Sequence, residues 1–407
     1  MSTAKPNPQF IQSIQAGLRY WQQKTETLEA EQVVWLDERR QNLHQAVLFG
    51  LNQSETWEDT VQVLLQAFDF SEWRGYWPEW IPVLEQALAT APDNETELYG
   101  RLQNRLGQLY RLDNRYPEAM TQHEQVLQLA KKLGNYRLTL FASAGLLEIY
   151  LKQRQIEQAE KVGAMALQLL EKDESHERLK AYILKNLAEV ENFVGNWHKS
   201  AEYLQSAIQL FRAQGNQVYV IRCTCDLGVT YLRGQDFTEA QRAFEEAAQL
   251  LEGTTYEIDR AKNYMNLGVL FFNQQKWAEA AEAFAQINPI ALREQREINL
   301  LAMLYNNFGN VYLKMAKWKQ AEENLELAIE IFRQTKNDLE LGNSLGTLAT
   351  VYVALNERDL AKRCFEEALA LLEQFPNSAW AKKITAEIKE GYHGLLKEEE
   401  GQPANNK

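Results

Sequence analysis

The sequence has 407 residues, of which 45% are hydrophobic, and its formal net charge at pH 7 is −13. This balance excludes a dominant basic surface of the kind that nucleic acid or an anionic membrane requires. The 20 glycines and 9 prolines are few for a sheet-rich fold, and long stretches rich in Ala, Leu, Glu, Gln and Lys favour helices. We therefore expect an all-α protein.

The first segment of the chain, residues 1–56, is predicted to hold two amphipathic helices, over 9–28 and 31–51. The polar start, Met1 to Phe10, has no charged-then-apolar signal pattern. The simplest interpretation is an N-terminal cap, because a solenoid needs a polar covering at its ends.

A helix-pair array is predicted over residues 57–375, and its first pair is degenerate. An apolar stretch runs from Val61 to Phe70, and a second helix is expected over 77–91. Trp80 occupies a position of this second helix at which later pairs have a small residue.

Seven further copies of one motif follow, each about 40 residues after the last. Each copy begins with a Leu or Phe that we call the leading residue; Gly or Ala usually follows it, and an aromatic residue usually stands four positions on. The leading residues are Leu106, Leu146, Leu187, Leu227, Leu267, Phe308 and Leu348. A small residue stands thirteen positions after each: Ala119, Ala159, Ser200, Ala240, Ala280, Ala321 and Ala361.

These offsets predict a pair of antiparallel helices in every copy. The leading residue, the close-approach glycine and the aromatic share one face of a first helix, and the small residue lets a second helix pack closely against it. Short turns such as Asp113–Tyr116 join the two helices. Successive pairs are expected to stack, so that each unit packs on its neighbours only.

The motif resembles the tetratricopeptide repeat (TPR) family, whose Leu-Gly-x2-Tyr, Ala and Phe positions it matches, although the leading Trp of that family is missing. The resemblance implies a right-handed α-solenoid, the TPR superhelix. The period of about 40 residues is similar to that of the long-repeat TPR subgroup. Glu38, Asn42, Leu43 and Ala46 also resemble a helix that precedes the TPR sensor arrays of STAND-class regulators, which are multidomain signalling ATPases.

At the other end, Ile384, Ile388, Tyr392 and Leu395 form a stripe at helical spacing. It predicts a C-terminal capping helix within residues 376–397. Residues 398–407, which are rich in Glu, Gln and Asn, are expected to be disordered.

No arrangement of residues points to catalysis. None of the five His has another His at i+3 or i+4, and neither a phosphate-binding loop nor a nucleophile elbow is present. We expect no enzyme activity, no cofactor and no metal. No apolar run approaches the roughly 20 residues that span a bilayer. The sequence has three cysteines, and this odd number is typical of reduced thiols, so we expect the protein in the cytoplasm.

A TPR solenoid exposes one face of each first helix along its concave side. The positions just before and after the leading residue are relatively basic and rich in Asn. The candidate residues for binding a peptide or protein are Arg101, Arg105, Phe141, Tyr182, Lys185, Asn186, Arg222, Lys262, Asn266, Asn306 and Asn310. Their simplest alternative role is to line a hydrated groove without binding anything.

These residues predict a scaffold or adaptor that holds another protein or an extended peptide, and the basic groups would favour an acidic one. The alternative is a regulatory sensor whose array binds a short signalling peptide or a small effector. The Lys and Asn spacing with which TPR cochaperones capture acidic chaperone tails is not present, because Glu189 and Asp226 stand where it needs Asn.

Overall fold

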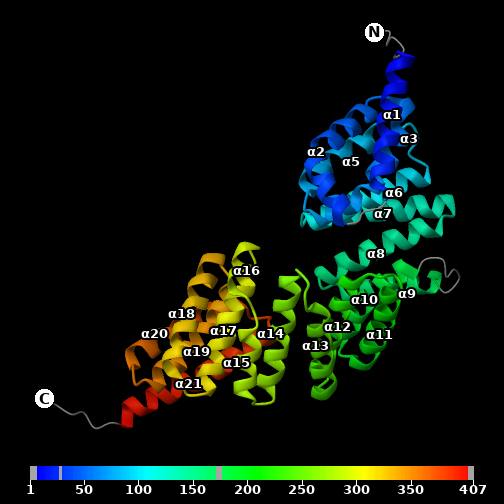
Figure 1. Cartoon of the computed structure of the whole chain (residues 1–407). Coiled ribbons are helices and arrows are strands. Elements are labelled where there is room, and N and C mark those ends of the chain that lie inside the picture. Colours follow the sequence, from blue (N-terminus) through cyan, green and yellow to red (C-terminus); the bar gives the residue numbers. More distant parts are fainter. Residues whose placement is uncertain (1–6, 27–29, 171–176, 402–407) are drawn as a thin grey trace. The chain divides into compact units, whose positions relative to one another are not determined.

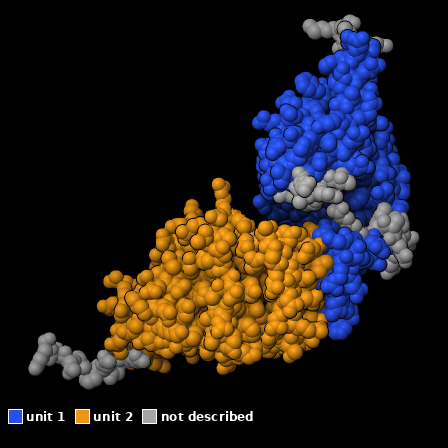
Figure 2. Space-filling model, viewed as in Figure 1, with its two compact units in different colours: residues 1–216 blue, residues 217–407 orange. Residues whose placement is uncertain are grey.

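The computed structural model describes residues 7–26, 30–170 and 177–401, and within them the regular structure is entirely helical (Figure 1). The predicted all-α fold is confirmed. The chain divides into two compact units, residues 1–216 (unit 1) and 217–407 (unit 2) (Figure 2). Each unit has hydrophobic clusters of its own, one of which, in unit 1, contains Trp57, Phe68 and Trp80.

Unit 1 begins with short and long helices that precede the regular repeats. They are α1 (Pro8–Thr25), α2 (Ala30–Leu51), a 3-10 turn (Ser54–Thr56), α3 (Trp57–Gln66), α4 (Phe68–Trp73) and α5 (Trp77–Ala89). The two predicted N-terminal helices thus correspond to α1 and α2, and residues 27 and 28 of the first prediction lie outside the described residues. In the degenerate pair, the first helix is interrupted at Ala67, which ends α3 before α4 starts. The indole of Trp57 donates a hydrogen bond of 2.8 Å to the carbonyl of Ala87 and so joins α3 to α5.

Seven helix pairs follow at the predicted positions, three in unit 1 and four in unit 2. We call the first helix of a pair its A helix and the second its B helix. The A helices are α6 (Glu97–Leu112), α8 (Tyr136–Lys152), α10 (Glu177–Val194), α12 (Gln217–Arg233), α14 (Glu257–Asn273), α17 (Ile298–Lys314) and α19 (Asp338–Ala354). The B helices are α7 (Tyr116–Leu133), α9 (Ile156–Leu170), α11 (Trp197–Ala213), α13 (Phe237–Leu251), α15 (Trp277–Ala285), α18 (Trp318–Thr335) and α20 (Arg358–Leu372).

The turn between A and B helices has the same backbone conformation in every pair. The residue eight positions after the leading residue lies in the left-handed region, with φ between 54° and 82°. These residues are Asn114, Arg154, Gly195, Gln235, Gln275, Ala316 and Asn356. Only one of them is glycine, so six of the seven turns hold a side chain in a conformation that disfavours it.

The close-approach glycines let the A and B helices of a pair interlock. A Cβ atom added to Gly228 would lie within 3 Å of the Phe244 ring, and one added to Gly268 would lie within 3 Å of the Phe284 ring. Both rings are buried. The glycine after the leading Leu therefore leaves the space that the bulky side chain of the B helix fills, as the repeat pattern predicts.

The fifth pair departs from the regular pattern. Its B helix, α15, ends at Ala285, and a separate short helix, α16 (Pro289–Glu294), takes up the rest of the segment. Asn288 caps α16 by accepting hydrogen bonds from the backbone N–H groups of Ile290 and Ala291, and Pro289 occupies its first turn. The Asn-Pro pair thus ends one helix and starts another.

The last helix, α21 (Ala379–Gly401), packs on α19 and α20. Ile384, Ile388 and Leu395 are buried, as the stripe predicts. The helix continues four residues past 397, into the segment that was expected to be disordered. Residues 402–407 of that expected tail lie outside the described residues.

Candidate functional site

The candidate binding residues lie on one face of the A helices, the A-helix face. In unit 1 they lie on α6, α8 and α10, and in unit 2 on α12, α14 and α17. The structure shows that several of these side chains are already engaged within the protein.

Arg105 of unit 1 is held by α4. Its guanidinium lies 4.1 Å from the centre of the Phe68 ring, and its Nη2 is 3.9 Å from Oδ1 of Asp69. Its Nη1 also donates a hydrogen bond of 3.0 Å to Gln108. Much of the charge of Arg105 is thus compensated by an acidic neighbour.

The aromatic and amide candidates on α10 are also engaged. The Tyr182 ring packs edge-on against the buried Phe211 ring of α11 with 5.1 Å between centres. Asn186 is only 3% exposed; its Nδ2 donates to Glu148 at 3.4 Å, and its Oδ1 accepts from Lys185 at 3.4 Å. Asn186 is thus almost fully buried, and its amide joins α8 to α10.

Arg222 in unit 2 forms a two-pronged ion pair. Its Nε and Nη2 donate to the two carboxylate oxygens of Asp259 on α14, at 3.0 and 3.2 Å. The interaction ties two neighbouring A helices together across their exposed face. Arg222 is therefore not the unpaired cation that the sequence alone suggested.

The asparagines of α17 link this helix to α19. Asn306 is 6% exposed and accepts a hydrogen bond of 2.8 Å from the Ser344 hydroxyl. Asn310 donates to the Asn306 carbonyl at 2.9 Å and accepts from Thr347 at 3.4 Å. Asn306 is thus buried and hydrogen-bonded within the protein, whereas Asn310 remains partly exposed.

Three candidates keep accessible polar groups without a hydrogen bond or ion pair in the described residues. Arg101 on α6 is partly exposed, as is Asn266 on α14, and Lys262 on α14 is exposed. Lys262 and Asn266 are one turn apart, so they share one side of the helix. Phe141 of α8 is partly exposed as well.

His123 lies four residues after the small residue Ala119, on the B helix of the first regular pair. It is fully buried on α7, and one ring nitrogen, Nδ1, lies 2.9 Å from Oδ1 of the buried Asn104. The other, Nε2, is buried without a hydrogen-bond partner. Gly107 and Gly145 leave the space that the ring fills, since a Cβ atom on either would lie within 3 Å of it. Burial, together with the charge of Arg111, lowers the pKa of His123 to about 3.

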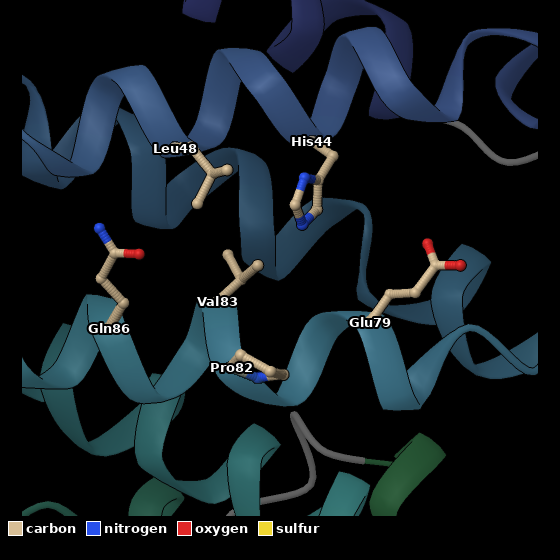
Figure 3. Close-up of a pocket in the computed structure, with 6 residues that line it drawn as sticks. All are labelled: His44, Leu48, Glu79, Pro82, Val83 and Gln86. Carbon is tan, nitrogen blue, oxygen red and sulfur yellow. The ribbon is translucent and has the colours of Figure 1, made fainter.

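Two cavities lie away from the A-helix face. One, of about 400 Å³, lies between α2 and α5 of unit 1, where His44 and Leu48 point toward Val83 (Figure 3). Arg40 and Glu79 form an ion pair of 3.3 Å beside it, and Gln86 bonds to Asn52 at 3.4 Å. The other, of about 490 Å³, lies between α18 and α20 of unit 2.

Among the described residues, no three His, Cys, Asp or Glu side chains lie grouped so that they could hold a metal ion. Within the same part of the chain, no helix is long and apolar enough to cross a membrane.

Comparison with characterised proteins gives one curated relative of weak similarity. The HTH-type transcriptional regulator MalT of Vibrio cholerae is 23% identical over 285 residues. That match covers 69% of this chain but only 30% of the regulator. The chain therefore spans less than a third of the length of this relative.

Solved structures of low identity share the fold. Apo RapI has a TM-score of 0.59 at 15% identity, with 74% of this chain and 84% of RapI covered. A Rap protein complexed with competence and sporulation factor has a TM-score of 0.54 at 14% identity, with coverages of 86% and 98%.

Family profiles match most of the predicted array. One tetratricopeptide repeat profile matches residues 81–172, 179–253 and 300–374, and a second matches residues 225–290. Together with the seven A and B helix pairs and their interlocking glycines, these matches show that the chain belongs to the tetratricopeptide repeat family.

Proposed function

We propose that this protein is a non-catalytic adaptor whose A-helix face holds an extended segment of another protein. The observation that carries the proposal is the pair Lys262 and Asn266 on α14. Both side chains reach solvent from one side of the helix, and neither has a polar partner in the described residues. An amide offers a donor and an acceptor together, which is what a peptide group in an extended chain requires.

Asn310 extends this surface onto α17. Its amide is already fixed by Thr347 and by the Asn306 carbonyl, so its orientation is set before a ligand arrives. A side chain that is ordered in advance loses less conformational entropy on binding. A polar surface on α14 and α17 fits recognition of a peptide backbone.

The charges of the A-helix face support only a limited preference for acidic ligands. Arg222 and Arg105 have acidic neighbours, so their attraction for a ligand carboxylate is largely offset. Lys262 in unit 2 and Arg101 in unit 1 are the cations that we assign to an acidic residue of the ligand. We place the protein in the cytoplasm, where such segments of other proteins are accessible.

A regulatory sensor is the second candidate. It is supported by the similarity in fold to a Rap protein whose structure was solved with competence and sporulation factor. A sensor would bind a short peptide or a small effector and change its dimensions when it does so. Small-angle scattering with and without ligand separates the two, because an adaptor keeps its radius of gyration apart from the added mass.

The proposal is tested by selecting peptides from a random 12-residue library displayed on phage. Selected peptides are then titrated by fluorescence anisotropy against wild type, Lys262→Ala/Asn266→Ala, and a matched control on B helices, Asn324→Ala/Arg363→Ala. We expect at least tenfold weaker binding by the α14 variant, which corresponds to about 1.4 kcal/mol. Equal affinities for wild type and the α14 variant would contradict the proposal.

A further inference from the structure

An apolar groove lies on the B-helix side of unit 2, between α18 and α20. Its volume is about 490 Å³, within the range of sites that take up ligands or partner side chains. The floor is formed by Ile329, Leu345 and Leu348, none of which is more than 5% exposed. The remaining residues of the lining are Glu326, Glu330, Arg333, Gln334, Cys364 and Glu367.

The groove lining carries an excess of negative charge. Arg333 is paired with Glu367, with Nη2 2.7 Å from Oε1. Glu326 accepts a hydrogen bond from the Tyr352 hydroxyl at 3.5 Å, and Glu330 accepts one from the Gln334 amide at 3.2 Å. Those two donors are neutral, so neither of them supplies a positive charge that would offset a carboxylate. Glu326 and Glu330 are also four residues apart on α18, a spacing at which like charges repel each other.

Two exposed leucines lie on the helices that form the walls, outside the groove lining. Leu327 is 44% exposed on α18, one helical turn before Glu330. Leu360 is 40% exposed on α20, one turn before Cys364.

The groove offers few main-chain hydrogen bonds to an occupant. Most of its walls are helix interiors, whose N–H and C=O groups are paired within each helix, and only Arg333 and Gln334 lie in the last turn of α18. An extended peptide would leave its own backbone groups unsatisfied there, whereas a helix satisfies its own. The geometry therefore selects a helical occupant.

We propose that the groove between α18 and α20 docks a basic amphipathic helix of a partner protein. Apolar side chains of that helix cover Ile329, Leu345 and Leu348, and its Lys or Arg side chains pair with Glu326 and Glu330. The walls of this groove are B helices, whereas the A-helix face lies on the A helices. The proposal therefore does not depend on peptide binding at the A-helix face.

Cys364 provides a reporter inside the groove. It is partly exposed, whereas Cys223 and Cys225 are buried. Burial raises the pKa of the Cys364 thiol to about 11, so alkylation is slow enough to follow by mass spectrometry. An occupant of the groove that covers the sulfur slows the reaction further.

The probes are two synthetic 18-residue amphipathic helices, one with Leu and Lys faces and the other with Leu and Glu faces. Affinities are measured by fluorescence anisotropy, and alkylation of Cys364 by iodoacetamide is measured in parallel at pH 8. We expect the Lys helix to bind and to slow alkylation of Cys364 at least fivefold, and the Glu helix to do neither. Binding of the Lys helix with unchanged alkylation would overturn the proposal, because the helix would then occupy another surface.

Variants separate this groove from general attraction to an acidic protein. Glu326→Gln/Glu330→Gln keeps the hydrogen-bond acceptors and removes two charges, and we expect it to weaken the Lys helix at least tenfold. Glu245→Gln/Glu246→Gln on α13 removes the same charge elsewhere in unit 2 and should change affinity less than twofold. Equal losses in both variants would overturn the proposal. So would protection of Cys364 that rises with protein concentration without any probe, which would identify a second copy as the occupant.

Discussion

The buried His123 makes the stability of this protein depend on pH in a way that one substitution should remove. The ring is fully buried, and its pKa falls from the usual 6.5 to about 3. In the unfolded chain the imidazole takes up a proton below pH 6.5, whereas in the folded chain it stays neutral down to about pH 3. Folding stability is therefore complete above pH 6.5 and is lost as the pH falls below it.

The magnitude follows from the two pKa values. Relative to pH 7, protonation of the unfolded chain lowers the free energy of unfolding by about 2 kcal/mol at pH 5 and by about 0.7 kcal/mol at pH 6. The His123→Leu variant introduces a leucine, the residue type that a later repeat has at the equivalent position, Leu325. It leaves Asn104 without its partner, which costs about 1–3 kcal/mol at every pH, so the slope with pH is the informative quantity.

The assay is urea unfolding at pH 7, 6 and 5, followed by circular dichroism. We expect wild type to lose about 2 kcal/mol more than His123→Leu between pH 7 and pH 5. The control is His198→Gln, because His198 is exposed on α11. Parallel pH dependences of wild type and His123→Leu would refute the reasoning.

Further predictions concern packing, turns and the ion pair of unit 2. Gly268→Ala should destabilise by about 1–3 kcal/mol in thermal or urea unfolding, because the new methyl group meets a buried ring. The matched Gly394→Ala, with open space around it in α21, should instead stabilise by about 0.5–1 kcal/mol, and the same sign for both would contradict the packing argument. Ala316→Gly should raise the urea midpoint by relieving its left-handed conformation, and a lower midpoint would show that φ of 54° costs nothing there. Arg222→Glu should lower the melting temperature because it faces Asp259, and Asp259→Asn in the same chain should restore part of the loss; no recovery would exclude repulsion as the cause.

The helix pairs could be predicted because each carries its own signal. The leading residue, the glycine after it and the small residue on the B helix recur in register, and packing of Phe244 on Gly228 shows why. The break between α15 and α16 was not predicted, because the last motif residue of this pair, Phe284, lies before the break. The Asn288-Pro289 pair was the local signal for that break.

The partners of the binding residues were harder to predict, because they lie in the neighbouring repeat. Arg222 is 37 residues from Asp259, and Asn306 is 38 residues from Ser344. These spacings are slightly shorter than the period, so the pairs cross between adjacent A helices. Periodicity gives the face on which a side chain lies, but the charge of the residue opposite it decides whether that side chain is free for a ligand.

The measurement that most directly tests the central claim is photocrosslinking with a peptide selected by phage display that carries a benzophenone group. Adducts are located by mass spectrometry after proteolysis. The account predicts adducts on A helices, foremost on α14 and α17, which carry Lys262, Asn266 and Asn310. Adducts confined to the B helices α13, α15, α18 and α20 would contradict it.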